Sequence, residues 1–455
     1  MNQQVMYWNS VLLEASRRDH SQGYANGQQS GPTKTSRAMA IVHLAIHDAV
    51  AYVDKPGAAY LKKKHSVMMA KPAGAQLADV INGAAVTALK AMYPLYHSFF
   101  DDSTDTTSTS VGFDFGGKIA QKLIDLRATD GSELPDPKAA PAAYGTHRAD
   151  PYNPGQGLLG AQWGAVDHFV GPRKALADFP GNGLPSFLTN ANYRKDYEEV
   201  RSLGALQRVG RTAEQTLIGT YWGYDGAQGI GVPPRLYNQI ARKVAMGLSL
   251  SATAELFAQL NVAMADAGID AWHYKYTNNL WRPVVGIRME PANDGDCFWA
   301  PLGAPQTNRL NIRPTTPPFP AYPSGHATFG AALFQTLRLR LAPGNAAITV
   351  AEVLATESSD PVVTSEEFKF ISDELDGRAL DTDGSVRTLH DRQINSYARA
   401  VWENAVSRVY LGVHWRFDGL PSSAAENIGG VPLGLAIGKQ VHEYFNKAPS
   451  LNAAA

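Results

Sequence analysis

The strongest constraint on the fold is a stripe of apolar residues at helical spacing between residues 37 and 54. Its members recur every three or four positions, namely Met39, Val42, Ala45, Ile46, Ala49, Val50 and Val53. Residues at that spacing share one face of an α-helix, so the stripe predicts a helix packed against a core. No segment of the chain alternates apolar and polar residues over a sustained length. The sequence therefore predicts an all-α fold.

Helical patterns of the same kind occupy nine further segments. They are residues 75–93, 117–127, 212–220, 234–246, 251–275, 327–341, 346–354, 395–411 and 433–445. Two irregular Pro-rich regions, 131–186 and 290–323, interrupt them, and aromatic residues in the first indicate that it packs on the helical body. We expect two packed helical bundles with long Pro/Gly-rich loops, an N-terminal bundle over residues 1–210 and a C-terminal catalytic bundle over residues 211–455.

Composition narrows the function classes. Of the 455 residues, 44% are hydrophobic, a share that excludes a disordered chain. The 41 Lys and Arg residues balance 42 Asp and Glu residues, so the chain has no excess positive charge to attract nucleic acid or an anionic membrane. The single cysteine, Cys297, excludes an internal disulfide and a cysteine-based zinc site. The chain has no uninterrupted apolar run of membrane-spanning length and does not open with a secretion signal. We expect a soluble protein, cytoplasmic or of unknown location, and leave a homo-oligomer open.

Three segments of the second half supply basic residues, glycine and histidine between them. In the first, residues 275–283, Lys275 and Arg282 are seven positions apart. One continuous helix would present both cations on the same face, about 10 Å apart along its axis, where they could hold a single anion. The plainer alternative is a solvated helix face that carries two unrelated basic residues.

The second segment, residues 322–328, leads directly into an apolar helix. Pro323 disfavours helix before it, Ser324 is a suitable N-cap, and Gly325 lets an anion approach the backbone amides of the first turn. His326 would then lie at the rim of an oxyanion cradle. The alternative is an ordinary N-cap followed by a surface histidine.

The third segment, residues 407–418, follows a predicted core helix that Gly412 is suited to end. Arg408 lies in the last turn of that helix and His414 just beyond it, so both could reach one pocket. Asp418, four residues further on, is placed to orient a ring nitrogen of His414. The alternative is that Arg408 only interacts favourably with the helix dipole and that His414 is a buried histidine whose hydrogen bonds are all made within the protein.

A site that collected all three segments would match a tetrahedral oxyanion, because guanidinium groups bind the oxygens of such anions bidentately. Its anion-binding groups would come from Lys275, Arg282, Arg408, the Ser324 hydroxyl and the Gly325 amide. His326 and His414 would add one acid–base group and one nucleophile or metal ligand.

These segments, in this order and spacing, resemble the vanadium-dependent haloperoxidases and also the type 2 acid phosphatases, which share their anion site. The nearest resemblance is to the vanadium chloroperoxidases. It includes Tyr-Trp-Gly-Tyr-Asp-Gly at residues 221–226 and Pro-Pro-Phe-Pro-Ala-Tyr-Pro-Ser-Gly-His at residues 317–326, and it covers about residues 212–445.

The resemblance implies a vanadate (vanadium(V)) cofactor bound axially through a neutral ring nitrogen of His414, the only metal ligand. The equatorial oxygens would be neutralised by Lys275, Arg282, Arg408, Ser324 and the Gly325 amide. His326 would hydrogen-bond the apical hydroxide and act as the acid–base group when hydrogen peroxide binds. Lys275 would polarise the bound peroxide, and Asp225 would pair with and orient Arg408.

Two aromatic residues bear on which halide is oxidised. Trp272 and Phe319 match the aromatic residues beside the metal in the chloroperoxidases, so the resemblance implies oxidation of chloride as well as bromide. Plain core packing is the alternative for both, because an aromatic side chain near a pocket mostly excludes water.

The predicted function is therefore oxidation of halide ions by hydrogen peroxide to hypohalous acid, which acts on small organic acceptors. A competing enzyme function is an acid phosphatase, in which His414 attacks phosphorus to form a phosphohistidine and His326 protonates the leaving alcohol. A third alternative, a non-catalytic oxyanion-binding protein, would have no need for His326 at the rim of the cradle.

Overall fold

The computed structural model describes residues 3–24, 27–104, 110–135, 143–177, 184–207, 210–289, 295–342, 344, 346–358 and 364–447. Helices of the first half are α1 (Gln3–Asp19), α2 (Gly31–Asp54), η1 (Pro56–Ala58), α3 (Tyr60–His65), α4 (Leu77–Met92), η2 (Pro94–Tyr96), α5 (His97–Asp102), α6 (Val111–Arg127), η3 (Trp163–Ala165), α7 (Leu184–Phe187) and α8 (Ala191–Leu203).

The second half adds helices and one small sheet. These elements are α9 (Ala213–Tyr221), α10 (Pro233–Val244), α11 (Leu250–Asn278), α12 (Pro283–Met289), α13 (Gly325–Leu341), α14 (Val350–Ala355), β1 (Phe368–Ile371), η5 (Asp373–Leu375), β2 (Asp391–Ile394), α15 (Tyr397–Tyr410), α16 (Arg416–Gly419) and α17 (Gly430–Asn446). The predicted mainly helical fold is confirmed.

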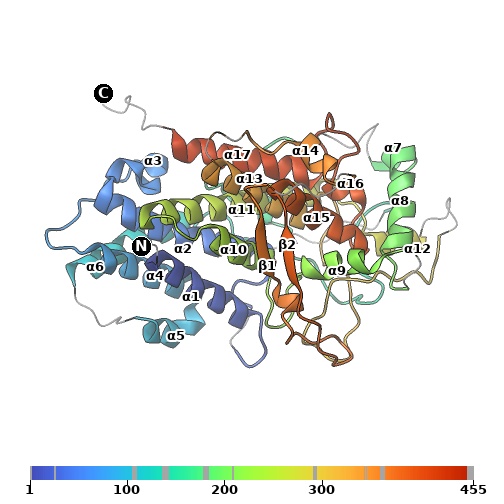
Figure 1. The fold of residues 1–455 in the computed structure, drawn as a ribbon, viewed down its shortest axis with the longest axis horizontal. Coiled ribbons are helices and arrows are strands. Elements are labelled where there is room, and N and C mark those ends of the chain that lie inside the picture. The colour runs from blue at the N-terminus through green and yellow to red at the C-terminus, as the bar shows by residue number, and fades with distance from the viewer. Residues whose placement is uncertain are drawn as a thin grey trace.

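Helix α11 is the centre of the molecule. It packs against α2 from the first half and against α13 and α17 from the second, and α13 packs in turn on α15. In Figure 1, α11, α13 and α17 follow the long axis, α3 to α6 lie toward one end, and α8 and α12 lie toward the other. The two halves of the chain thus share one apolar core, and the division at residue 210 stays a prediction.

The first irregular region does pack on the helical body, through two carboxylates of α11. Asp266 accepts hydrogen bonds from the backbone amides of Phe169 (2.7 Å) and Val170 (3.0 Å). Asp270 accepts one from the amide of Lys174 (2.8 Å). Because buried carboxylates need hydrogen-bond partners, these bonds hold the irregular region against α11. They also place the residues that precede Phe169 beside the end of α11.

One sequence expectation about local structure is wrong. Lys275 and Arg282 do not share a helix, because α11 ends at Asn278 and Asn279 takes a left-handed conformation with φ of 49°. Pro283 begins the separate helix α12, and a residue before proline is disfavoured in helical geometry. Both cations are fully buried, so the alternative of a solvated helix face is also wrong.

Several elements carry no clear signal in the sequence. Helix α8 escaped because its stripe is short, with Tyr193, Tyr197 and Val200 buried among charged residues. Strands β1 and β2 pair antiparallel with Phe368 opposite Ile394, and each is only four residues long, too short for sustained alternation. In the described part of the chain, no helix has the length and apolar character to cross a membrane.

Candidate active site

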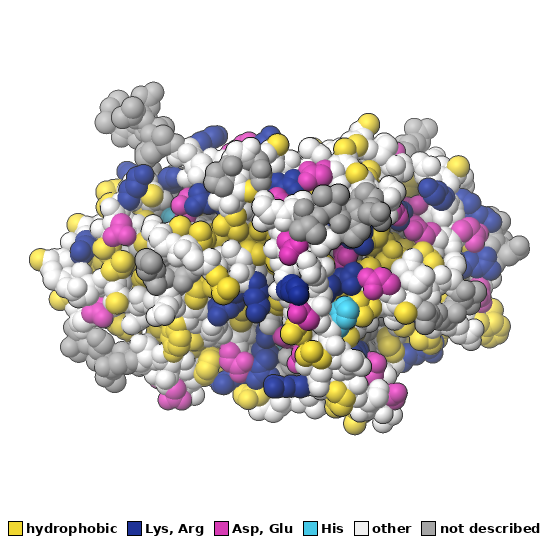
Figure 2. Space-filling view, viewed as in Figure 1, with side chains coloured by type: hydrophobic (Ala, Val, Ile, Leu, Met, Phe, Trp, Pro, Cys, Tyr) yellow, Lys and Arg dark blue, Asp and Glu magenta, His cyan; other side chains and the backbone are white. Residues whose placement is uncertain are grey.

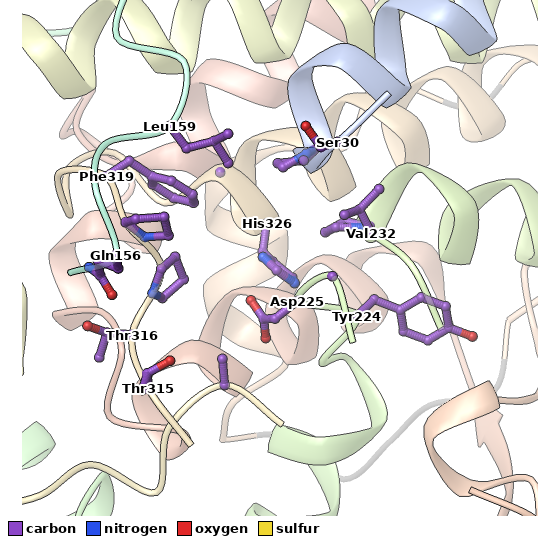
Figure 3. Close-up of a pocket in the computed structure, with 18 of the residues that line it drawn as sticks. Ser30, Gln156, Leu159, Tyr224, Asp225, Val232, Thr315, Thr316, Phe319 and His326 are labelled. Carbon is purple, nitrogen blue, oxygen red and sulfur yellow. The ribbon is translucent and has the colours of Figure 1, made fainter. Parts of the chain in front are cut away.

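The second and third motif segments line a cavity of about 430 Å³, and Arg282 of the first segment reaches it through His414, 3.0 Å from its Nε2. Its walls come from both halves of the chain, and Figure 3 shows His326 projecting into it between Phe319 and Val232. Positively and negatively charged side chains are interspersed on the face of the molecule drawn in Figure 2. The charges that could select a ligand are therefore the buried ones around the cavity.

The N-terminus of α13 forms one wall. Ser324 is its N-cap, and the hydroxyl accepts a hydrogen bond from the amide of Ala327. A Cβ atom on Gly325 would lie 3.2 Å from a ring carbon of Trp272, so a larger residue would crowd that ring. Glycine thus keeps the first-turn amides open to an anion, and the positive end of the helix dipole favours one there.

Arg282 is anchored so that one nitrogen stays free. Its Nε donates to the Phe319 carbonyl (2.9 Å), and its Nη1 donates to the Val413 carbonyl (2.7 Å) and lies 3.0 Å from Nε2 of His414. Its buried Nη2 has no partner among the described residues. Burial lowers the pKa of Arg282 to about 9, which still leaves it charged at neutral pH.

Arg408 shows the same arrangement on the last turn of α15. Its Nη1 and Nη2 donate to the two carboxylate oxygens of Asp225 at 2.9 and 2.6 Å, so the expected ion pair is present. Its Nε is buried and has no partner within the described residues. A guanidinium held in this fork still has its Nε hydrogen to offer to a ligand. The helix ends where Gly412, with φ of 70°, reverses the chain toward His414.

Lys275 is bound differently from the two arginines. Its Nζ donates to the carbonyls of Pro320 (2.9 Å), Ala321 (3.0 Å) and Pro323 (2.6 Å), which uses all three hydrogens. Burial, followed by the charge of Arg282, holds the pKa of Lys275 well below its ordinary value. The ammonium lies under the loop that leads into α13, and its predicted contact with anion oxygens stays a prediction.

His414 has one ring nitrogen paired with a carboxylate and one that faces Arg282. Its Nδ1 donates to Asp418 (2.8 Å), whose carboxylate also accepts from the amide of Trp415 (3.0 Å). Nε2 therefore carries the lone pair, as a metal ligand or a nucleophile requires. Burial and the nearby cations lower the pKa of His414 well below its usual value, so the ring is neutral. The backbone carbonyl of Asp418 also accepts a hydrogen bond from the amide of Ser324 (2.7 Å). This bond joins the second and third segments.

His326 is held at the rim of the cavity. Its Nε2 donates to the Gly223 carbonyl (2.6 Å), and its own carbonyl accepts from Asn404 (2.7 Å) and Tyr237 (3.1 Å). Burial, followed by the charge of Arg408, lowers the pKa of His326 to about 3. Because Nε2 carries the hydrogen, Nδ1 is left as a proton acceptor.

The aromatic rings of Trp272 and Phe319 pack beside the buried cations Lys275 and Arg282. Their ring centres are 4.8 Å apart. The Lys275 ammonium lies 5.1 Å from the Phe319 ring centre, and the Arg282 guanidinium lies 4.9 Å from it. Such contacts stabilise desolvated cations and keep water from the interior side of the site.

The donor set fits an oxyanion rather than a metal cation. Within the described ranges, no group of three or more His, Cys, Asp or Glu residues could hold a metal ion. Three buried cations, an open helix N-terminus and one histidine whose unprotonated Nε2 lies beside Arg282 instead suit an anion such as vanadate or phosphate.

Sequence reasoning missed the wall contributed by the first half. His20, Gln156 and Leu159 line the cavity, and the sequence around them carries no motif that relates them to residues more than a hundred positions away. It also missed Tyr237 and Asn404, whose side chains fix the backbone of His326. These contacts follow from the fold alone.

Fold and site together define a helical protein whose buried cations and open helix N-terminus suit a tetrahedral oxyanion beside a histidine. Two family models match the chain: the VCPO second helical-bundle domain over residues 255–449, and the vanadium chloroperoxidase N-terminal domain over residues 1–158. The vanadium chloroperoxidase of Curvularia inaequalis is 32% identical over 501 residues, in an alignment that covers 93% of this chain and 80% of the relative. The chain belongs to the vanadium chloroperoxidase family, whose members are vanadium-dependent haloperoxidases.

Solved structures agree with this fold at low sequence identity. The first bacterial vanadium-dependent iodoperoxidase gives a TM-score of 0.67 at 18% identity, covering 97% of this chain and 96% of that one. A holo-type bacterial vanadium-dependent chloroperoxidase gives 0.59 at 16% identity, covering 91% and 92%. Relatives of this fold therefore bear names that refer to different halides.

Proposed function

We propose that this haloperoxidase oxidises bromide and chloride with hydrogen peroxide to hypohalous acid, with vanadate held at His414. The observation that carries the proposal is the pair of buried guanidinium nitrogens, Nη2 of Arg282 and Nε of Arg408, that have no partner in the described structure. Unsatisfied buried charged donors are costly, so they favour binding of an anion at this point.

The residues of the site divide the work of holding such an anion. His414 would bind vanadium through Nε2, while Asp418 fixes the opposite side of the ring. Arg282 and Arg408 would donate to the oxygens, and the charge of Lys275 would add to theirs. Vanadate bound there would supply a Lewis acid that withdraws electron density from hydrogen peroxide.

His326 is suited to take up the proton that hydrogen peroxide loses. It is neutral, it lines the cavity, and its Nδ1 is a free acceptor. A bound anion would raise its pKa from the low value found without one, because opposite charge favours the protonated ring. The same group could then return the proton when water leaves.

The proposal that chloride is oxidised depends on the exclusion of water by Trp272 and Phe319. Chloride is harder to oxidise than bromide and so needs a more strongly activated peroxide. Trp272 and Phe319 are almost fully buried beside the cations, and a low local dielectric strengthens the action of Lys275 and Arg282 on the peroxide. Hypohalous acid formed here would react with small organic acceptors.

The test is halide oxidation by purified protein with and without added orthovanadate. We expect bromide and chloride oxidation that depends on both vanadate and hydrogen peroxide, measured as halogenation of a phenol dye. Hydrolysis of a phosphate monoester is measured in parallel. Efficient phosphatase turnover without vanadate-dependent halogenation would instead support the acid phosphatase, in which His414 forms a phosphohistidine.

A further inference from the structure

Helix α8 packs against three elements that carry or adjoin the anion-binding groups. Helix α15 bears Arg408, α12 begins one residue after Arg282, and α16 begins two residues after His414. In Figure 1, α8 lies with α12 and α16 at one end of the molecule. All residues of α8 are described, and none of them lines the cavity. Any effect of α8 on the site must therefore act through its neighbours.

Asp196 of α8 holds the first turn of α16. Its Oδ2 accepts a hydrogen bond from the amide of Phe417 (2.9 Å). Amides in the first turn of a helix have no acceptor within the helix, so an acceptor from another element fixes the turn. Both residues are buried, so water does not readily replace the bond and its loss would leave a buried donor unsatisfied.

The turn held by Asp196 carries the carboxylate that orients His414. Asp418 directly follows Phe417, and its Oδ2 accepts from both Nδ1 of His414 (2.8 Å) and the amide of Trp415 (3.0 Å). Its Oδ1 is buried and has no partner in the described structure. The carboxylate thus makes its bonds only within its own turn, so the direction of the His414 ring depends on where the backbone of α16 is held.

A second contact of α8 joins the same turn to Arg282. The ring centre of Tyr193 lies 5.2 Å from that of Trp415, the residue after His414. The Tyr193 hydroxyl accepts from Nε1 of Trp281 (3.1 Å), the residue before Arg282, and the Trp281 carbonyl accepts from Nε1 of Trp415 (3.0 Å). Helix α8 is therefore itself fixed relative to both groups, as a positioning element must be.

Asp196 acts through a hydrogen bond rather than through an ion pair. No ion pair of Asp196 occurs among the described residues, and Arg416 at the start of α16 pairs with Glu199 (2.9 Å) and with Glu357. Burial, followed by the charge of Glu199, raises the pKa of Asp196 to about 7, so the group is partly protonated at neutral pH. A neutral asparagine, which keeps an acceptor oxygen, is therefore a close substitute.

We propose that Asp196 is a positioning residue for the vanadium ligand: by holding the first turn of α16, it sets the direction in which Nε2 of His414 points. The inference rests on the proposed haloperoxidase function for the identity of the bound anion. The alternative is that the bond only stabilises a short helix at the edge of the fold. Its loss would then lower stability and leave anion binding unchanged.

The test measures vanadate binding to metal-free protein without turnover, by equilibrium dialysis with elemental analysis. Asp196→Ala removes the acceptor, and Asp196→Asn keeps it. Removing a group that orients a metal ligand typically weakens metal binding by about 10–100-fold. Because Asp196 orients His414 only through a neighbouring carboxylate, we expect Asp196→Ala to weaken vanadate binding about tenfold, the low end of that range. Asp196→Asn should stay near the wild-type affinity.

Asp48→Ala is the matched control. Asp48 is a buried carboxylate whose oxygens accept from the amides of Tyr60 (2.6 Å) and Leu61 (2.8 Å) at the start of α3. Helices α3 and α8 lie toward opposite ends of the molecule in Figure 1, and Asp48 does not line the cavity. Asp48→Ala should lower the free energy of unfolding, measured with urea, while vanadate affinity stays at the wild-type value.

The vanadium NMR signal of the bound anion gives a readout that a loss of stability alone does not move. Its position reports the bond to the histidine nitrogen. Asp196→Ala should therefore shift the signal, whereas Asp196→Asn and Asp48→Ala should leave it in place.

Equal vanadate affinity and an unshifted vanadium signal in wild type and Asp196→Ala would overturn the proposal. Equal weakening in Asp196→Ala and Asp48→Ala would overturn it too, because general destabilisation would then account for the loss, and so would an Asp196→Asn protein as weak as Asp196→Ala. Weaker binding in Asp196→Ala alone, with no halide oxidation by vanadate-loaded wild type, would retain Asp196 as a positioning residue and reject the haloperoxidase function. Should Asp196→Ala fail to fold, Asp196→Ser, whose side chain is too short to reach the Phe417 amide, decides the same question.

Discussion

The two walls of the cavity differ in how firmly their polar groups are anchored. On the anion-binding wall, Arg282 and Arg408 each make two or more hydrogen bonds and keep one nitrogen free. On the wall from the first half, the ring of His20 makes one hydrogen bond, to the Ser16 carbonyl, and the side-chain nitrogen of Gln156 has no partner among the described residues. Charged groups fixed in advance can stabilise developing charge without rearrangement, whereas loosely held neutral groups can adapt to a ligand's shape.

Removing the centre of the anchored wall should have the largest effect. His414→Ala deletes the only group of this wall that is suited to bond to a metal. We expect halide oxidation to be abolished and vanadate to be lost on desalting, measured by elemental analysis and by bromide oxidation. His97→Ala is the control. Retention of vanadate and activity at wild-type levels would show that the ligand is a different residue.

Breaking the fork of Arg408 should cost stability as well as activity. Asp225→Asn leaves a buried guanidinium without its counter-charge, so we expect the free energy of unfolding to fall by about 3–5 kcal/mol. Vanadate should restore part of this loss because it supplies negative charge to Arg408. Chemical unfolding with and without vanadate measures both. An equal vanadate effect in Asp225→Asn and wild type would argue against contact between Arg408 and the anion.

Behind the same wall, a buried carboxylate links stability to pH. Glu374 accepts from the Tyr224 amide (3.1 Å), next to the residues that hold His326 and Arg408. Burial raises its pKa to about 7 from 4.5, although Arg387 opposes the rise. A raised carboxyl pKa means that stability present below pH 4.5 is lost as the pH rises through 7.

The shift corresponds to at most about 3 kcal/mol. Glu374→Gln should remove the fall in unfolding free energy between pH 4.5 and 7, measured by urea unfolding at several pH values. A wild type that grows more stable across that range would show that the ion pair with Arg387 outweighs burial.

The smallest expected effect concerns the aromatic cover of the cations. Phe319→His admits a polar, titratable group and its water, so it should lower chloride turnover more than bromide turnover, by a few-fold. The ratio of chloride to bromide rates in both proteins at mildly acidic pH is the measurement. A ratio unchanged by the substitution, or a wild type that oxidises no chloride, would remove the proposed role of Phe319 in halide choice.

The same contrast between walls explains what the sequence could predict. Ser324, Gly325 and His326 follow from a local signal, a cap and a glycine before an apolar helix, and Asp418 lies only four residues after His414. The helices with long apolar stripes were predicted for the same reason. The prediction that Lys275 and Arg282 share one helix was wrong. Asn279 ends α11, and Pro283 begins the separate helix α12.

The other wall had no comparable signal. His20 directly follows α1 and reaches the cavity because α1 packs on α10 and α11, and that packing depends on side chains distributed over the whole chain. The orientation of its ring depends on a single bond to the Ser16 carbonyl. Neither contact leaves a pattern of spacing, so the wall from the first half could be found only in three dimensions.

The central claim is that the anchored wall binds vanadate and that the bound anion makes the protein a haloperoxidase. The most direct measurement is a titration of metal-free protein with orthovanadate, following bromide oxidation at saturating hydrogen peroxide, with phosphate added as a competitor for the same cations. The account predicts activity that rises from the metal-free baseline to a plateau at one vanadate per chain and falls as phosphate increases. Activity independent of vanadate, or a plateau that phosphate leaves unchanged, would contradict it.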